Sequence, residues 1–262
     1  MAVETLSRNK KQSDAGAAER ITISVSTHVM GKIDERYNVG FPMQGNIGFE
    51  CAVSIKESIK NIAECASAGG EGYAAMIAAA YSVLKIDSPG LAAEVAQKLE
   101  GIAISINPNR VEETMVEASC IIEYFNGMAR RVPEALDIFE GALCGGEDNN
   151  QMHRSLIEIQ STAGNSYAAA LKCASAAACT GDPHMVLDIL KRVAKDTKRG
   201  SAVVACAMIM LDSGGDIGYA MDPIREISKS ASYGRLDDKQ ILAMAGRFSK
   251  RKVLGSAART AA

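Results

Sequence analysis

Hydrophobic residues recur along most of the chain at the spacing of an α-helix. Ile55, Ile59 and Ile62 share one face of a predicted helix that begins near residue 46 and ends at the glycine pair 69–70. Similar apolar stripes, separated by Gly, Pro or Asn, continue as far as residue 248. They predict helices at 73–84, from 89 onward, and at 111–130, 134–143, 152–160, 167–178, from 183 onward, 201–211, 222–230 and 237–248. We expect an all-α fold, because no segment shows a convincing strand pattern.

The other segments are interpreted from their composition. Residues 1–20 mix charged residues with Ser, Ala and Gly, which is typical of a flexible N-terminal arm. Residues 249–262 form a basic C-terminal tail, and we expect one helical-repeat domain over 21–248. Within that domain, residues 21–26 alternate between polar and apolar. This pattern permits a strand, a short helix or an extended arm. The segment 38–48 holds three glycines and a proline and is predicted to be a loop.

Two segments, 70–99 and 164–193, are similar to each other without a gap. Six of their 30 positions are identical, among them Pro89 and Pro183, each of which would open a second helix. Other positions match in character, namely Ser88 with Asp182 as helix caps and Leu91, Val95 and Leu99 with Met185, Ile189 and Val193 on the apolar stripe.

Segments 116–142 and 201–227 extend this similarity to four units. The equivalent starting residues are Tyr73, Val116, Tyr167 and Ser201, which lie 43, 51 and 34 residues apart. One of these spacings suits a two-helix repeat of about 34 residues. We therefore expect stacked antiparallel helix pairs in an irregular α-solenoid. The alternative is that Ala-rich helices followed by Gly or Pro resemble one another without being repeats.

The residue pattern of these units resembles that of the pentatricopeptide-repeat family over about residues 70–230. The resemblance is carried by Ser166-Tyr167-Ala168, by Gly181-Asp182 and by the Glu-Ala-Leu-Asp-Ile-Phe run at 134–139. It implies paired helices and an RNA whose bases are read by polar side chains of the first helix. Here the residues that follow Tyr73 and Tyr167 are alanines, which form no side-chain hydrogen bonds. We therefore expect no base-specific RNA recognition.

The charge of the chain is nearly balanced but unevenly placed. The 262 residues include 29 Lys and Arg and 31 Asp and Glu. The resulting net charge of −2 argues against a uniformly basic nucleic-acid binder. Residues 109–158 carry a net charge of −6, and 235–262 a net charge of +5. Candidate contacts to phosphates or to an acidic partner are Lys191, Arg192, Lys195, Lys198, Arg199, Arg247, Lys250, Arg251 and Lys252. The alternative for the first five is a solvated set of cations near a helix C-terminus.

No motif predicts a catalytic, cofactor-binding or metal-binding residue. The acid pairs Glu112-Glu113 and Asp237-Asp238 are more typical of helix N-termini than of catalysis. The three histidines are far apart and follow no ligand spacing. The seven cysteines are odd in number, form no Cys-x-x-Cys pair and lie mostly in apolar stretches, which favours buried, reduced thiols in an intracellular, reducing compartment. For Cys173 and Cys179 we expect raised pKa values and little reactivity.

These patterns together favour a non-enzymatic function. We expect a helical scaffold or structural subunit of a larger assembly, whose partners are other protein subunits or further copies of the chain. The alternative is an RNA-associated protein that binds the phosphate backbone without reading bases. No membrane insertion is expected, because the longest apolar run, 201–211, is too short to span a bilayer. Import into an organelle stays open, although three acidic residues in 1–20 are untypical of an import signal.

Overall fold

The computed structural model describes residues 27–37, 45–67, 72–125, 127–145, 150–214, 216–234 and 236–248. All regular elements in these ranges are α-helices or short 3₁₀ turns, and they contain no strand, which confirms the predicted all-α class. The predicted arm at 1–20, the segment 21–26 and the tail at 249–262 lie outside the described residues. No helix in the described ranges is both long enough and apolar enough to cross a membrane.

The chain divides into two compact units, Met1–Val116 and Glu117–Ala262. Unit 1 contains a helix over 27–37, followed by α2 (Gly45–Ser67), α3 (Gly72–Val83) and α4 (Pro89–Ser105). After a 3₁₀ turn, α5 (Val111–Tyr124) crosses the boundary between the units. Unit 2 then contains α6 (Val132–Cys144), α7 (Asn150–Thr162), α8 (Tyr167–Cys179), α9 (Pro183–Thr197), α10 (Gly200–Asp212), α11 (Ile217–Ser232) and a helix over 238–248. That one helical-repeat domain covers residues 21–248 stays a prediction.

The helix over 27–37 is held to the rest of unit 1 by Tyr37. Val29, Ile33 and Tyr37 recur every four residues and are buried. The Tyr37 hydroxyl donates to the carbonyls of Val83 at 2.7 Å and Ile86 at 2.9 Å, at the end of α3. Burial raises the pKa of this phenol to about 12. This helix was not predicted from the sequence, because its apolar stripe is only three residues long.

Two predicted boundaries are wrong, and glycine geometry explains both. The predicted loop over 38–48 gives way to helix at Gly45, the first residue of α2. A Cβ on Gly48 would lie 2.7 Å from the Tyr37 carbonyl oxygen, so the missing side chain permits a close approach that an ordinary helix residue would block. The predicted helix over 111–130 ends instead at Tyr124, and Gly127 then turns the chain with φ of +85°.

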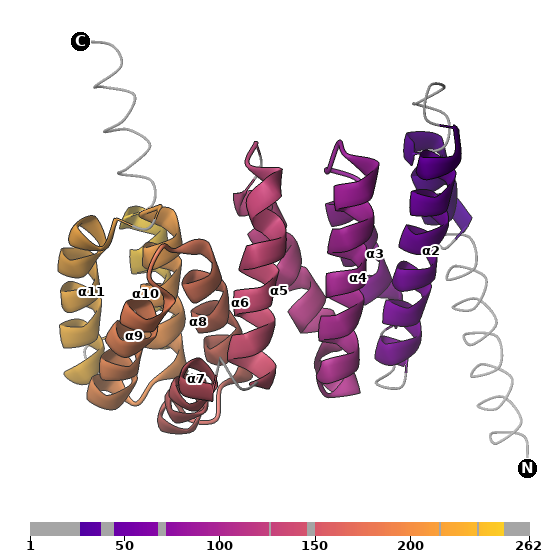
Figure 1. Ribbon diagram of the computed structural model, residues 1–262. Helices are drawn as coiled ribbons and strands as arrows, with labels where there is room; N and C mark the ends of the chain where they lie inside the picture. Colours follow the sequence, from indigo (N-terminus) through magenta and orange to yellow (C-terminus); the bar gives the residue numbers. More distant parts are fainter. Residues whose placement is uncertain are drawn as a thin grey trace, which may run out of the picture. The chain divides into compact units, whose positions relative to one another are not determined.

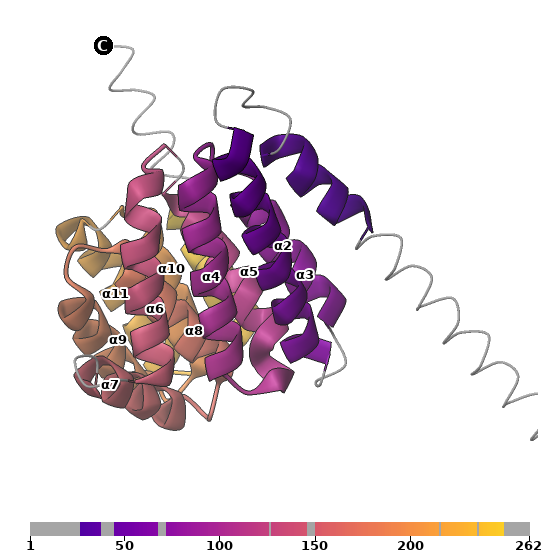
Figure 2. The ribbon, with the colours of Figure 1, turned by 45° about the vertical axis from the view of Figure 1, so that its right-hand side comes forward.

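Unit 2 is built from three regular helix pairs. Its first helices α6, α8 and α10 begin 35 and 33 residues apart, and its second helices α7, α9 and α11 begin 33 and 34 residues apart. Each first helix packs on the next first helix, each second helix on the next second helix, and the two members of every pair pack on each other (Figures 1 and 2). This is the arrangement of a helical-repeat fold. The repeat start placed at Val116 is wrong, because α6 pairs with α7 and the regular spacing begins at Val132.

The helix α8 lies at the centre of unit 2. It contacts α6, α7, α9 and α10, and ten of its residues are buried. Most of these are Ala, Ser or Cys, because only small side chains fit a helix that is covered on so many sides. The low aromatic content of the chain therefore reflects close helix packing in this unit.

Candidate functional site: a groove between α9 and α11

Two of the predicted basic contact residues form ion pairs inside unit 2. Lys195 Nζ lies 2.7 Å from Glu158 Oε1, and Lys191 Nζ lies 3.7 Å from Glu158 Oε2 and 3.4 Å from Asp188 Oδ1. Glu158 belongs to α7, the second helix that packs beside α9. The hydrogen bond from Lys195 holds the pKa of Glu158 below its usual range. These two lysines therefore join neighbouring second helices in the structure.

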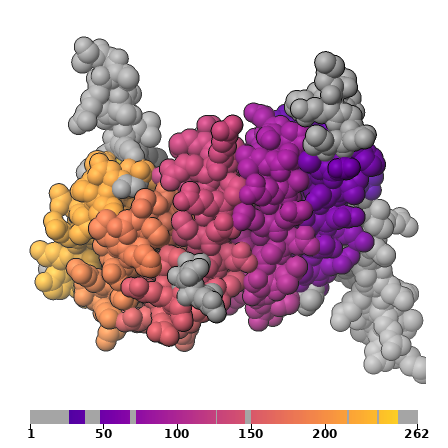
Figure 3. Space-filling model, in the orientation of Figure 1, coloured from indigo at the N-terminus to yellow at the C-terminus, as the bar shows by residue number. Residues whose placement is uncertain are grey.

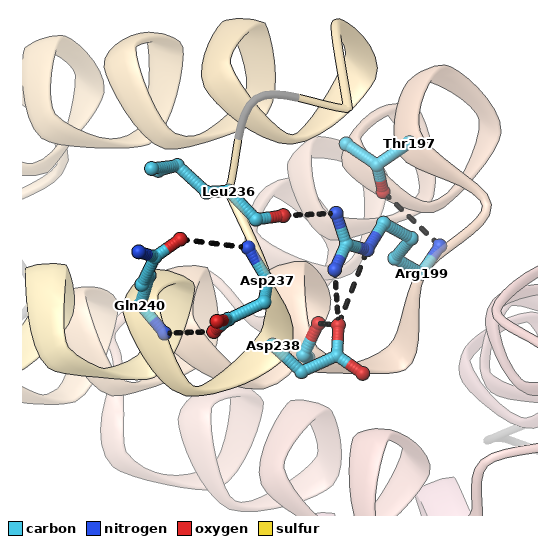
Figure 4. A network of polar contacts seen from close by, with 7 residues as sticks. Thr197, Arg199, Leu236, Asp237, Asp238 and Gln240 are labelled. Atoms are coloured by element: carbon cyan, nitrogen blue, oxygen red, sulfur yellow. Dashed lines mark hydrogen bonds and ion pairs between the residues drawn. The ribbon is translucent and has the colours of Figure 1, made fainter.

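Arg199 takes part in a network that holds the start of α10 to the helix over 238–248 (Figure 4). Its guanidinium donates to Asp238 Oδ1 through Nε at 3.2 Å and to the Leu236 carbonyl at 2.7 Å. Ser201 Oγ donates to the same Asp238 oxygen at 2.6 Å. Hydrogen bonds from Ser201 and Arg199 lower the pKa of Asp238. The Arg199 side chain is partly buried, and its contacts connect the start of α10 to the last described helix.

Asp237 lies at the N-terminus of a helix, which confirms the interpretation of the Asp237-Asp238 pair as a helix start. The Gln240 backbone N–H donates to Asp237 Oδ1 at 2.8 Å, and the Asp237 N–H donates to Gln240 Oε1 at 2.9 Å (Figure 4). These reciprocal bonds form a capping box at the N-terminus of the last described helix.

The remaining predicted basic residues belong to different elements. Lys198 ends α9 in the left-handed conformation and is exposed. Arg247 is exposed on the helix over 238–248, and Arg192 lines a groove beside α11. Lys250, Arg251 and Lys252 lie outside the described residues. Of the described members of the set, Arg192 is the one that lines this groove.

The groove beside Arg192 lies between the second helices α9 and α11 and has a volume of about 590 Å³. One face of α9 lines it with residues at helical spacing, and a longer face of α11 lines the other side. The lining residues are Ile189, Arg192, Val193, Asp196, Met221, Ile224, Arg225, Ser228, Lys229, Ser232 and Tyr233. Figure 1 shows α9 and α11 in the orange and yellow part of the ribbon, and Figure 3 shows that atoms fill the space between the ribbons of this part in the same view.

The floor of this groove is apolar and its rim is charged. Val193 and Ile224 lie at the floor, each 3% exposed, beside the half-buried Ile189 and Met221. Pro223 lies inside α11 next to this floor and has no N–H to donate to the carbonyl of the preceding turn, so α11 lacks one helical hydrogen bond there. The packing of α11 on α9 is less extensive than that of α7 on α9.

The rim carries three basic side chains and one acid. Arg225 forms an exposed ion pair with Asp222 on the same helix, 3.1 Å away. Arg192 and Lys229 form no ion pair with any described residue. Asp196 is the acid that lines the groove. Arg192 was among the residues predicted from the sequence, but the α11 side of the groove was not, although Met221 and Ile224 at apolar spacing next to Arg225 and Lys229 gave a signal for it.

Three cysteines of unit 2 lie in the core, and they include the two for which the sequence predicts raised pKa values. Cys173, Cys179 and Cys206 are buried. Burial raises the pKa of Cys179 and of Cys206 to about 12, and raises that of Cys173 as well. Thiols in such surroundings are almost fully protonated at neutral pH and are poor nucleophiles. The interpretation of the other cysteines as buried is wrong, since Cys51, Cys65 and Cys144 are half-buried and Cys120 is exposed.

A buried ion pair that the sequence analysis missed lies in unit 2. Lys172 Nζ on α8 donates to both carboxylate oxygens of Glu117 at 2.7 and 2.8 Å, and the Glu117 side chain is 9% exposed. The two residues are 55 positions apart, so no sequence spacing connects them. Elsewhere in the described ranges, no group of three or more His, Cys, Asp or Glu residues is placed to hold a metal ion.

Comparison of the chain with protein-family models, curated proteins and solved structures found no match. The resemblance to the pentatricopeptide-repeat family therefore rests on the residue patterns alone and stays a prediction.

Proposed function

We propose that this protein is a non-enzymatic helical scaffold, which binds a segment of a partner protein in the groove between α9 and α11. The observation that carries the proposal is the combination of an apolar floor and a charged rim on the surface of a helical-repeat unit. Repeat folds of this kind offer extended surfaces for binding. Protein segments that bind grooves between helices place apolar side chains on the floor and polar groups at the rim.

The energetics of such binding are favourable but modest. Two or three partner side chains buried on this floor would contribute about 3–9 kcal/mol. The loss of translational and rotational freedom on association opposes most of this, so we expect affinities in the range of about 1–100 μM. Affinities of this order suit a subunit that joins an assembly through several contacts at once.

The proposal is tested by the size of the native complex. Gel filtration of extract from cells that naturally express the chain should place it in a species larger than the purified protein. A photoreactive amino acid at Ser228, in the groove, should cross-link the chain to a protein of that species. The same amino acid at Ser161, exposed on α7, serves as the matched control and should give much less of that product.

Two results would contradict the proposal. One is elution of the native chain at the position of the purified protein. The other is a large species that collapses to this position after ribonuclease treatment, which would favour the RNA-associated alternative.

A further inference from the structure

The charge of the groove indicates which kind of segment it binds. We infer that the occupant is an acidic amphipathic segment of a partner protein, an inference that rests on the proposed function and adds the chemistry of the partner. Arg192 on α9 and Lys229 on α11 approach the groove from its two sides, and neither is neutralised by a described acid. With Arg225 and Asp196 included, the rim has three positive charges and one negative charge.

The ion pair of Arg225 does not weaken this argument. Its partner Asp222 is almost fully exposed, and the two residues are three positions apart on one helix. Exposed pairs of this kind contribute little to stability, so Arg225 can exchange Asp222 for a carboxylate of the partner. Arginine is well suited to the exchange because its guanidinium binds carboxylates through two parallel hydrogen bonds.

The spacing of the lining residues indicates the length and pattern of the segment. They extend from Met221 on α11 to Tyr233, the residue that follows this helix, which corresponds to about 18 Å along the helix axis. A partner helix of about 12 residues matches this length. Its apolar side chains would recur every three or four residues on the face against Ile189, Val193 and Ile224, with Asp or Glu at the flanks.

The same geometry is less suited to RNA. A phosphate backbone is bound by clustered cations, whereas Lys191, Lys195 and Arg199 are already held by Glu158 and Asp238. The floor of the groove consists of aliphatic side chains and Met, which cannot donate hydrogen bonds to phosphate oxygens. An acidic peptide with apolar anchors satisfies both the floor and the rim.

A selection from random peptides of about 12 residues, displayed on phage, tests this inference with the full chain as the target. The enriched sequences should combine Asp or Glu with apolar residues spaced three or four positions apart. The best peptide, labelled with a fluorophore, is then titrated by anisotropy. A variant carrying Arg192→Glu and Lys229→Glu should bind it on the order of 10-fold more weakly. Met221→Gln, which removes apolar surface from the floor, should also weaken binding.

The matched control carries Arg154→Glu and Lys239→Glu, which make the same change in net charge at exposed positions outside the groove. It should bind the peptide as the unmodified protein does, within about 2-fold. Thermal unfolding of every variant verifies that it is folded. The difference between the groove variant and the control should shrink as salt is raised, because exposed charges are screened.

The inference is overturned by any of three results: no enriched peptide, enriched peptides that are neutral or basic, or equal binding by the two double variants. It is also overturned if a labelled oligouridine of about 20 nucleotides binds through Arg192 and Lys229 while peptides do not. These failures differ from failure of the proposed function. A native complex that persists in the Arg192→Glu, Lys229→Glu variant leaves the scaffold intact and removes only the groove chemistry.

Discussion

The helix pair α3–α4 of unit 1 and the pair α8–α9 of unit 2 have the same local structure but different surroundings. Positions 94 residues apart correspond throughout, as the gapless similarity of 70–99 with 164–193 predicts. Both second helices begin with proline, after a cap residue whose side chain accepts a backbone N–H three residues on. The buried positions of the first helices also correspond, with Ala75, Met76, Ala79 and Ala80 matching Ala169, Ala170, Cys173 and Ala174.

The difference lies on the opposite face of the first helix. Tyr81 in α3 is 50% exposed, whereas the corresponding Ser175 in α8 is 1% exposed. Within unit 2, α8 is covered by α6, α7, α9 and α10. Local sequence thus sets where each helix begins and which face turns inward, while neighbouring helices set how large a side chain the other face accepts. The following predictions test this comparison.

The largest effect is expected from exchanging the two residues that differ most. Ser175→Tyr places a large side chain where α8 is fully covered and should destabilise unit 2 by at least about 3 kcal/mol. Tyr81→Ser, the reverse change at the exposed position, should alter stability by less than about 0.5 kcal/mol. Urea unfolding followed by circular dichroism measures both. Similar losses for the two variants would show that the two helices are equally covered.

A smaller effect is expected at Tyr37, which secures the end of α3, whereas the end of α8 is secured by Thr180 Oγ1 donating to the Ala177 carbonyl. Tyr37→Phe removes the donor to two carbonyls and should destabilise unit 1 by about 1–2 kcal/mol.

This tyrosine also predicts a pH dependence. Its pKa is raised to about 12 in the folded chain, so the unfolded chain loses the proton first as the pH rises. The contribution of Tyr37 is fully present below its ordinary pKa near 10 and is lost as the pH rises toward 12. The free energy of unfolding, measured between these values, should fall more steeply for the unmodified protein than for Tyr37→Phe. Parallel curves would contradict the role assigned to this phenol.

The helix caps should differ in strength. Asp182 Oδ1 accepts the Met185 N–H at 2.9 Å, whereas Ser88 Oγ accepts the Leu91 N–H at 3.5 Å. Asp182→Ala should therefore destabilise its unit by about 1 kcal/mol, and Ser88→Ala by about 0.5 kcal/mol. Thermal unfolding of the two variants provides the measurement. A greater loss for Ser88→Ala would reverse the order that the distances give.

These examples show what the sequence could and could not predict. The caps and the 94-residue correspondence were visible because both depend on neighbours within a few positions. The loop predicted over 38–48 extended too far, because Gly48 lies in α2 and serves a close approach to Tyr37 that is set by tertiary packing. Of the basic residues predicted near the end of α9, Lys191, Arg192 and Lys195 lie on the helix, whereas Lys198 and Arg199 follow its last residue. The ion pairs of Lys191 and Lys195 depend on Glu158 in α7, and the groove depends on the separation of α9 from α11, so neither follows from one helix.

The smallest effect concerns the contacts between neighbouring second helices in unit 2 and between α2 and α4 in unit 1. Glu158 joins α7 to α9 through the partly buried Lys191 and the exposed Lys195, whereas Asn61 Nδ2 on α2 donates to Glu100 Oε1 on α4 at 2.6 Å. Glu158→Gln should reduce stability slightly, and about 0.5 M NaCl should abolish that difference, because salt screens an ion pair at the surface. The loss caused by Asn61→Ala should depend less on salt, because an amide donor carries no net charge.

Acid should act on the Glu158 contact in the same direction as salt. The hydrogen bond from Lys195 lowers the pKa of Glu158 in the folded chain, so its contribution is present above the ordinary carboxyl pKa and is lost as the pH falls through the lowered value. Urea unfolding of the unmodified protein and of Glu158→Gln should therefore converge in acid and diverge toward neutral pH. A difference that persists in both acid and high salt would mean that Glu158 stabilises the fold through packing. Its ion pairs with Lys191 and Lys195 would then contribute little, and these lysines could bind an external anion.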